Sequence, residues 1–125
     1  MTPGASTILL VDDEDVVRGL VREVLLTQGY EVLEAFDGDG AVLLAARHDG
    51  PLDLLLTDVA MPGLSGPEAA ELIRRIHPSV QVVFMSGHWD AAISDEVPFL
   101  QKPFTPAVLA RTVRHALGGA AALLR

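Results

Sequence analysis

Acidic side chains follow two apolar runs of the sequence, and these carboxylates are its first candidates for chemistry. Asp58 follows the leucine-rich run Leu52–Leu56, and Asp12 with Asp13 follows Thr7–Val11. Continuous apolar runs of this length are typical of strands buried on both faces of a parallel sheet. Open α/β sheets bind ligands at the carboxyl ends of their strands, where these carboxylates stand. An aspartate after a strand also caps turns, so Asp58 alone leaves a site and a simple turn as alternatives.

A hydroxyl and an amine follow two later apolar runs. Ser86 comes directly after Val80–Met85, and Lys102 comes directly after Phe99–Gln101. The carboxyl ends of parallel strands lie along one edge of a sheet, so side chains far apart in sequence can converge there. The side chains that we expect to converge are those of Asp12, Asp13, Asp58, Ser86 and Lys102.

Together these residue types could transfer a phosphoryl group. Clustered carboxylates repel one another and stay ionised only beside a cation. Oxygen ligands, in a chain with no cysteine and no clustered histidines, favour Mg²⁺ over zinc or copper. A carboxylate oxygen of Asp58 could attack an electrophilic phosphorus while Lys102 and the Ser86 hydroxyl stabilise charge on the phosphoryl oxygens. The pattern therefore favours Mg²⁺-dependent phosphoryl transfer to an aspartate.

The segments between the apolar runs carry the signals of helices. Apolar residues recur at helical spacing after the first acidic run and stop at Gly29, a typical terminator. Ser65 and Glu68 form a capping box that opens a later helix. Thr105-Pro106 supplies an N-cap and a first-turn proline for a last helix, which we expect to end near Leu117.

Strand and helix patterns alternate along the whole chain. A strand over Glu31–Phe36 and a turn at Asp37-Gly38 precede a helix over Ala41–His48. The segment His88–Pro98 is weakly patterned and has room for at most a short helix. This alternation predicts an α/β fold, a doubly wound five-stranded parallel sheet with helices on both faces.

The length indicates one domain. At 125 residues the chain can bury roughly two-thirds of the surface of the unfolded chain, which is enough for a single core. No repeat or linker divides it. We expect the domain to span residues 7–117, with tails at residues 1–6 and 118–125.

Charge and composition exclude several functional classes. The net charge of −8 argues against binding to nucleic-acid phosphates. No apolar run is long enough to cross a bilayer, and the first residues lack the regions of a signal peptide. The absence of cysteine excludes disulfides and thiolate metal sites. We therefore expect a cytoplasmic protein that acts through protein partners, without nucleic acid or membrane.

Five separated motifs make the chain resemble the response-regulator receiver domains of bacterial two-component signalling, over about Thr7 to Leu117. The resemblance implies a flavodoxin-like sheet with strand order 2-1-3-4-5, as in chemotaxis regulators. This chain has several residues fewer than the usual receiver between its fourth and fifth strands, so we expect the family's fourth helix to be short or irregular. The motifs are Asp12-Asp13, Asp58, Ser86, Phe99 and Lys102-Pro103.

The resemblance also assigns roles to the acidic residues. It implies that Asp58 is the phospho-acceptor. Mg²⁺ would bind directly to Asp13 and Asp58, to Asp12 through water, and to the backbone carbonyl of Ala60. These ligands are all oxygen atoms, which is the donor type that Mg²⁺ prefers.

The remaining motifs have roles in transfer and switching by the same resemblance. Ser86 occupies the hydroxyl position, and Lys102 is the lysine of the Lys-Pro motif, whose Lys102-Pro103 bond would be cis. Phe99 stands at the position of the aromatic residue whose rotamer reports activation.

The implied partners are proteins. The phosphoryl donor would be the phosphohistidine of a histidine kinase or histidine phosphotransferase, and the receiver would also catalyse its own dephosphorylation. The signal would pass to a downstream protein or a fused output domain, with a homodimer formed on phosphorylation as an open option. A single-domain regulator and a receiver from a longer protein are both compatible with the sequence. A phosphoryl sink without output is the alternative.

Two other classes use related chemistry or a related fold. A haloacid-dehalogenase-like phosphohydrolase needs a second aspartate two residues after its nucleophile as general acid, but Ala60 stands there. A flavodoxin-like redox carrier needs a phosphate-binding loop after its first strand. The carboxylates of Asp12 and Asp13 would repel that phosphate, so both classes are disfavoured.

Overall fold

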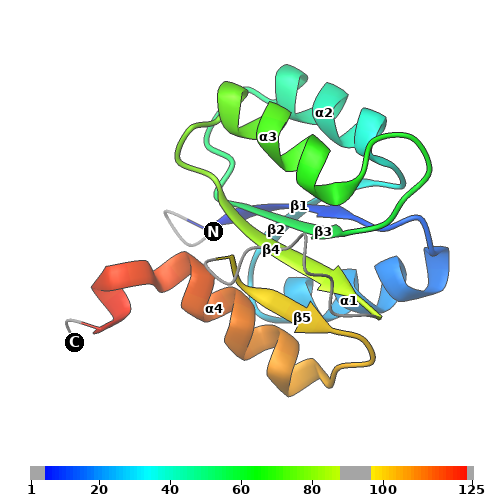
Figure 1. Cartoon of the computed structure of the whole chain (residues 1–125). Helices are drawn as coiled ribbons and strands as arrows, with labels where there is room; N and C mark the ends of the chain where they lie inside the picture. The colour runs from blue at the N-terminus through cyan, green and yellow to red at the C-terminus, as the bar shows by residue number, and fades with distance from the viewer. Residues whose placement is uncertain (1–4, 88–96, 124–125) are drawn as a thin grey trace.

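Five parallel strands form a single sheet in the computed structural model, which describes residues 5–87 and 97–123 (Figure 1). The strands are β1 (Thr7–Val11), β2 (Glu31–Ala35), β3 (Leu54–Asp58), β4 (Gln81–Ser86) and β5 (Phe99–Gln101). Their spatial order is β2-β1-β3-β4-β5. This order confirms the predicted doubly wound α/β fold and the strand order that the family resemblance implies.

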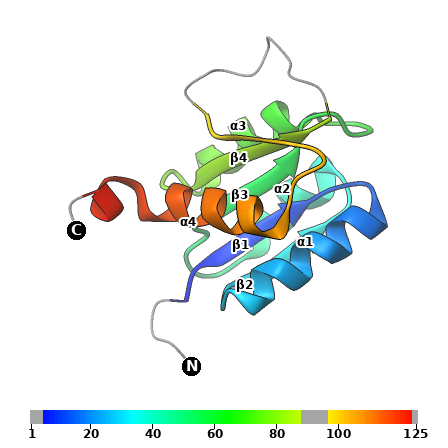
Figure 2. The same ribbon diagram turned by 90° about the horizontal axis from the view of Figure 1, so that it is seen from below.

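In the described part of the chain, each face of the sheet carries two helices. These are α1 (Asp15–Thr27), α2 (Gly38–Arg47), α3 (Gly66–Ile76) and α4 (Pro106–Leu123). The helices α2 and α3 lie side by side on one face, and α1 and α4 pack together on the other (Figures 1 and 2). Among the described residues, no helix combines the length and the apolar character needed to cross a membrane.

The two central strands, β1 and β3, are buried along their whole length. Successive side chains of a strand point to opposite faces. Leu9 and Leu55 therefore pack in the core under α2 and α3, whereas Leu10 and Leu56 pack in the core under α1 and α4. This burial on both faces explains the continuous apolar runs in the sequence and anchors the carboxyl ends of both strands.

Local signals in the sequence set most helix ends. Gly29 follows α1 with a φ of 91°, a left-handed conformation that favours glycine. At the start of α3, Ser65 Oγ accepts a hydrogen bond from the Glu68 N–H (3.2 Å), and Glu68 Oε1 accepts one from the Ser65 N–H (3.0 Å). At α4, the Val108 N–H donates to Thr105 Oγ1 (3.1 Å). The predicted capping box and N-cap are confirmed.

The start of α2 differs from the prediction. The helix begins at Gly38 rather than at Ala41, so the predicted turn at Asp37-Gly38 is wrong. Asp37 is instead the N-cap and accepts a hydrogen bond from the Gly40 N–H (2.7 Å). A Cβ on Gly38 would lie 2.7 Å from Leu64 of the loop before α3. This long-range contact accounts for a glycine at the first position of the helix.

The end of α4 also differs. The helix continues to Leu123, beyond the predicted end near Leu117. Gly118-Gly119 lowers helix propensity, but the following Ala120–Ala122 has the highest propensity of any residue type. The short or irregular fourth helix that we expected between the fourth and fifth strands falls on residues 88–96, which lie outside the described residues.

Candidate functional site

Three strand ends bring the central site residues together. Asp12 directly follows β1, Asp58 is the last residue of β3, and Lys102 directly follows β5. Val11 pairs with Thr57 in the parallel ladder between β1 and β3, so Asp12 and Asp58 come level with each other at the carboxyl edge of the sheet. The Lys102-Pro103 peptide bond is cis, as the family resemblance implies.

The ammonium of Lys102 lies among three carboxylates. Its Nζ is 2.9 Å from Asp12 Oδ2 and 3.4 Å from Asp58 Oδ2. The third carboxylate belongs to Glu14, whose Oε1 is 3.5 Å from the same Nζ. The Asp12 side chain is fully buried, so its charge depends on this ion pair for compensation. The site is therefore a compact group of charges at the edge of the sheet.

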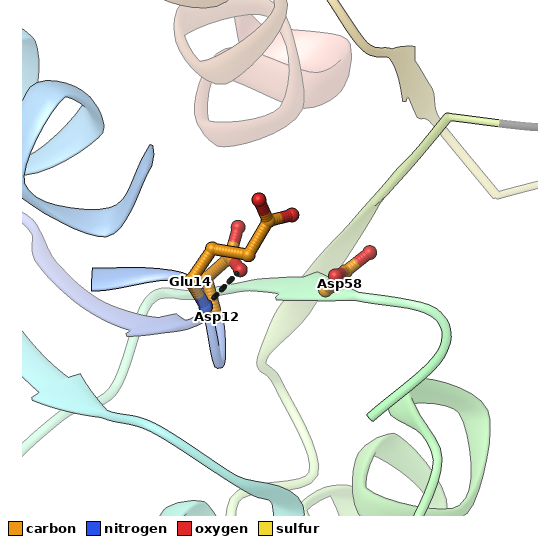
Figure 3. A group of neighbouring side chains, drawn as sticks. All are labelled: Asp12, Glu14 and Asp58. Atoms are coloured by element: carbon orange, nitrogen blue, oxygen red, sulfur yellow. Dashed lines mark hydrogen bonds between the residues drawn. The ribbon is translucent and has the colours of Figure 1, made fainter. Parts of the chain in front are cut away.

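Asp12 and Asp58 each use one carboxylate oxygen to contact Lys102 and the other to accept a hydrogen bond from a backbone N–H. Asp12 Oδ1 accepts a hydrogen bond from the Glu14 N–H (2.9 Å), which closes the loop after β1 (Figure 3). Asp58 Oδ1 accepts one from the Val59 N–H (3.0 Å). In both residues Oδ2 is the oxygen that contacts Lys102. These contacts fix how the two carboxylates face each other.

The surroundings shift the pKa values of Asp58 and Lys102. Burial raises the pKa of Asp58 above its ordinary 3.8; the nearby Lys102 opposes this shift, and the charge of Asp12 adds to it. Desolvation by itself would lower the pKa of Lys102. Its hydrogen bond and charge attraction to Asp12, and those to Asp58, outweigh this effect and raise the pKa above 10.5. Lys102 therefore stays charged at neutral pH.

Three carboxylates among the described residues are close enough together to bind one metal ion. Oxygen atoms of Asp12, Glu14 and Asp58 all lie within 4.8 Å of one another. Figure 3 shows Asp12 and Glu14 projecting from the loop after β1, opposite Asp58 at the end of β3. A donor set of three carboxylates fits Mg²⁺, a hard cation that prefers oxygen ligands.

The composition of this group differs from the expected acidic pair. Asp13, expected as a direct ligand, is exposed, and its carboxylate lies outside the group. Glu14 lies inside the group, although nothing in the sequence distinguishes it from its acidic neighbours. The available signal was the acidic run Asp12–Asp15, which does not indicate which side chains turn inward. The role of Asp13 stays a prediction for the Mg²⁺-bound protein.

The other predicted residues occupy the neighbouring strand ends. Ser86 is the last residue of β4, and its carbonyl accepts a hydrogen bond from the Lys102 N–H (2.8 Å). Phe99 opens β5 and is half-buried against the core under α2 and α3. Ala60 follows β3 on the exposed loop before α3. Ser86 and Ala60 therefore lie at or next to the edge where the acidic group is found. Phe99 lies one ladder position before that edge, because it pairs with Phe84, which pairs with Thr57.

A groove leads away from the site between α1 and α4. Its volume is about 530 Å³, and its lining is mostly apolar, from Val17, Leu20 and neighbouring residues of α1 to Phe104 beyond β5. Glu14 and Lys102 line the same groove, so it is continuous with the acidic group. Leu20 is 65% exposed on this face.

Comparison with known proteins agrees with this geometry. A family model described as "Response regulator receiver domain" matches residues 8–114. The sensor kinase CckA of Brucella abortus is 39% identical over 91% of this chain and 13% of its own length. The nitrogen assimilation regulatory protein NtrX of Azorhizobium caulinodans is 38% identical over 90% of this chain and 26% of its own length. The chain thus spans only a minor part of these relatives.

Solved structures give the same result. The receiver domain of the hybrid histidine kinase CckA superposes with a TM-score of 0.80 at 40% identity, covering 90% of this chain and 99% of that chain. The chemotaxis protein CheY4 of Vibrio cholerae superposes with a TM-score of 0.82 at 27% identity, covering 91% of this chain and 100% of that chain. With the family model matching most of its length, this chain belongs to the response regulator receiver domain family.

Proposed function

We propose that this chain is the phospho-accepting receiver of a two-component phosphorelay, in which Asp58 takes a phosphoryl group from a phosphohistidine. The donor would be a histidine kinase or a histidine phosphotransferase. The observation that carries the proposal is the strand-end carboxylate of Asp58, held beside Lys102 and facing the carboxylates of Asp12 and Glu14. Matches to a sensor kinase and to a regulatory protein support it.

The transfer exchanges one bond for another. An oxygen of the Asp58 carboxylate forms the new bond to phosphorus, and the P–N bond of phosphohistidine breaks with its electron pair moving to the imidazole nitrogen. The Lys102 ammonium, held 2.9 Å from Asp12, can stabilise negative charge on the phosphoryl oxygens. We assign the same role to the Ser86 hydroxyl. Attack of water on the acyl phosphate later releases phosphate and restores the Asp58 carboxylate.

The acidic group provides the residues that would hold Mg²⁺. Asp12, Glu14 and Asp58 are the carboxylates that the fold brings together. We propose the Ala60 carbonyl and Asp13 as additional ligands because the family resemblance implies them. When bound, the ion supplies positive charge that reduces the repulsion between the acceptor carboxylate and the phosphoryl oxygens.

Incubation with phosphoramidate and Mg²⁺ tests the acceptor chemistry. We expect about one acid-labile phosphoryl group per chain, because one carboxylate acts as nucleophile. Chelation of the metal should prevent both labelling and later hydrolysis. Release of phosphate without any accumulated label would instead support a phosphohydrolase, and absence of both label and released phosphate would contradict the proposal.

The apolar groove beside the site would receive the donor protein. It ends at Glu14 and Lys102, so a partner seated there can present a phosphohistidine to Asp58. Leu20→Ser should slow transfer from a phosphorylated histidine kinase several-fold while phosphoramidate labelling stays unchanged. Leu43→Ser is the matched control, because Leu43 is 50% exposed on α2, on the other face of the sheet. Equal transfer rates in the two variants would place the docking surface elsewhere.

We further propose that phosphorylation switches a protein-interaction surface through Ser86 and Phe99. Phe99 pairs with Phe84 across β4 and β5, so movement of β5 relative to β4 would displace its ring. Amide exchange in β5 should therefore change when the protein binds Mg²⁺ and beryllofluoride, which mimics the phosphoryl group. Unchanged protection throughout β4 and β5 would favour a phosphoryl sink without output.

A further inference from the structure

The first residue of α3 packs directly against the backbone of the acceptor. Gly66 is buried, and its N–H donates to the Val59 carbonyl (2.7 Å). A Cβ on Gly66 would overlap the Asp58 carbonyl oxygen and lie 3.1 Å from both the Asp58 carbonyl carbon and Val59 Cα. The atoms in the way are backbone atoms of β3 and the following residue, which cannot rotate aside as a flexible side chain can.

The same peptide orients the acceptor carboxylate. The Val59 N–H donates to Asp58 Oδ1 (3.0 Å) and to the Met85 carbonyl of β4 (2.9 Å). Gly66 thus contacts the peptide from α3 while Met85 holds it from the sheet. Because Oδ1 depends on this peptide for its hydrogen bond, a shift of the peptide would reorient the Asp58 carboxylate relative to Lys102.

Backbone conformation does not require a glycine at this position. Gly29, Gly50 and Gly63 are the glycines with positive φ in the described ranges, and Gly66 is not among them. Alanine has a higher helix propensity than glycine, so Gly66→Ala would favour the helix if nothing packed against it. The close approach to Asp58 is therefore the physical reason for a glycine here.

We propose that Gly66 is a positioning residue for phosphoryl transfer: its missing side chain lets α3 abut the Asp58–Val59 peptide and hold the acceptor carboxylate toward Lys102. This inference rests on the proposed function. A side chain at position 66 would push the peptide or the helix away and misplace the nucleophile. Small displacements of a reacting group lower rates strongly, because the reaction needs a near-attack geometry.

Gly38 offers a matched control. It is also buried, is also the first residue of a helix, and also has no positive φ. A Cβ there would lie 2.7 Å from Cβ and from the carbonyl oxygen of Leu64. Gly38→Ala therefore also introduces a clash, with Leu64, at a place that does not contact the Asp58 peptide.

The test compares Gly66→Ala and Gly38→Ala with wild type under conditions where circular dichroism shows all three folded. We expect the maximal labelling rate at saturating phosphoramidate and Mg²⁺ to fall about 10- to 100-fold in Gly66→Ala and to change little in Gly38→Ala. Bound beryllofluoride should also show altered fluorine NMR signals only in Gly66→Ala. If wild type is labelled normally and the two variants have equal labelling rates and equal fluorine NMR spectra, the role of Gly66 is overturned while the proposed function stands.

If Gly66→Ala does not fold, a second pair of variants tests whether the contact between Gly66 and Asp58 affects the labelling rate. Ser65→Ala removes the α3 N-cap and loosens the contact of Gly66 with Asp58, whereas Asp37→Ala removes the α2 N-cap as a control. We expect slower labelling in Ser65→Ala than in Asp37→Ala, and equal rates would overturn the inference. A wild-type protein that accepts no phosphoryl group would overturn the proposed function and this inference together.

Discussion

The central strand β3 has an aspartate at each end, and the two residues have different surroundings. Asp53 precedes the strand, and its Oδ2 accepts a hydrogen bond from the buried Thr7 N–H (2.8 Å). Asp58 ends the strand, and its Oδ2 lies 3.4 Å from the Lys102 ammonium, near the carboxylate of Asp12. The first aspartate completes the backbone pairing of β1, and the second belongs to a group of charges.

The two aspartates differ in their partners rather than in their residue type, and the partners of Asp58 suit the reactive role that we propose for it. A backbone N–H satisfies the carboxylate of Asp53 at a position fixed by the ladder. Burial and the charge of Asp12 raise the pKa of Asp58, although Lys102 opposes them. An anion held in this way gains from an added cation, which is the condition for a metal-assisted nucleophile.

The largest effect should come from removing the cation. Lys102→Met leaves the fully buried Asp12 carboxylate without its ion pair, so we expect a loss of about 3 kcal/mol of unfolding free energy. The labelling rate should fall about 100- to 1000-fold, because a donor to the phosphoryl oxygens is lost. Urea unfolding and phosphoramidate labelling measure the two effects. Lys102→Arg, which keeps the charge, is the control, and unchanged stability in Lys102→Met would contradict the ion-pair assignment.

The aspartate at the other end of β3 should affect stability alone. Asp53→Ala leaves the buried Thr7 N–H without its acceptor, which should cost about 1–3 kcal/mol of unfolding free energy. Labelling at Asp58 should stay unchanged when the protein is folded. Asp53→Asn retains an acceptor oxygen and should recover most of the stability. A large loss of labelling in folded Asp53→Ala would mean that the two ends of the strand are coupled.

The raised pKa of Asp58 predicts a pH-dependent difference in stability without metal. The Asp58 carboxyl binds its proton more tightly in the folded protein than in the unfolded chain. Proton binding therefore stabilises the fold fully at pH values below 3.8, and this stabilisation is lost as the pH rises through the pKa of Asp58 in the folded protein. Asp58→Asn carries no such charge. In the presence of a chelator, Asp58→Asn should therefore melt at a higher temperature than wild type, and this difference should grow as the pH increases toward neutrality. Added Mg²⁺ should reduce the difference in melting temperature.

The control for this pH series is Asp49→Asn, because Asp49 is an exposed aspartate outside the acidic group. Its melting temperature should follow that of wild type at every pH. If Asp58→Asn is the less stable protein at neutral pH in chelator, the acceptor charge does not oppose folding and the electrostatic account of the site is wrong.

The smallest effect should appear at the exposed member of the acidic group. Glu14→Gln removes one of three neighbouring carboxylates, so Mg²⁺ affinity measured by calorimetry should fall several-fold. Asp13→Asn provides the comparison, because the family resemblance implies direct metal binding by Asp13. Unchanged affinity in Glu14→Gln, with a loss in Asp13→Asn, would show that Glu14 is not a ligand.

The sheet and the main site residues could be predicted because their signals are local. The continuous apolar runs of β1 and β3 reflect burial on both faces, and each ends in a carboxylate. Parallel pairing then brings Asp12 and Asp58 together without further information. Lys102 could be placed because it directly follows the last strand of the same sheet.

Features that depend on contacts between distant segments, or on how a loop turns, could not be predicted. From the sequence alone, Gly38 resembles a turn residue. The structure explains why a helix begins at this glycine, because Leu64 packs against it and leaves no room for a side chain. Glu14 belongs to an acidic run in which the sequence does not distinguish inward from outward side chains. The hydrogen bond from its N–H to Asp12 turns this loop and brings Glu14 into the acidic group.

We propose Asp58 as the nucleophile among the neighbouring acids. Reduction of the labelled protein with borohydride, followed by peptide mass spectrometry, marks the carboxylate that formed an acyl phosphate. We expect the mark on Asp58 and none in Asp58→Asn, because Asp58 is the strand-end carboxylate that faces Lys102. A mark on Asp12, Asp13 or Glu14 in the wild-type protein would show that Asp58 is not the nucleophile.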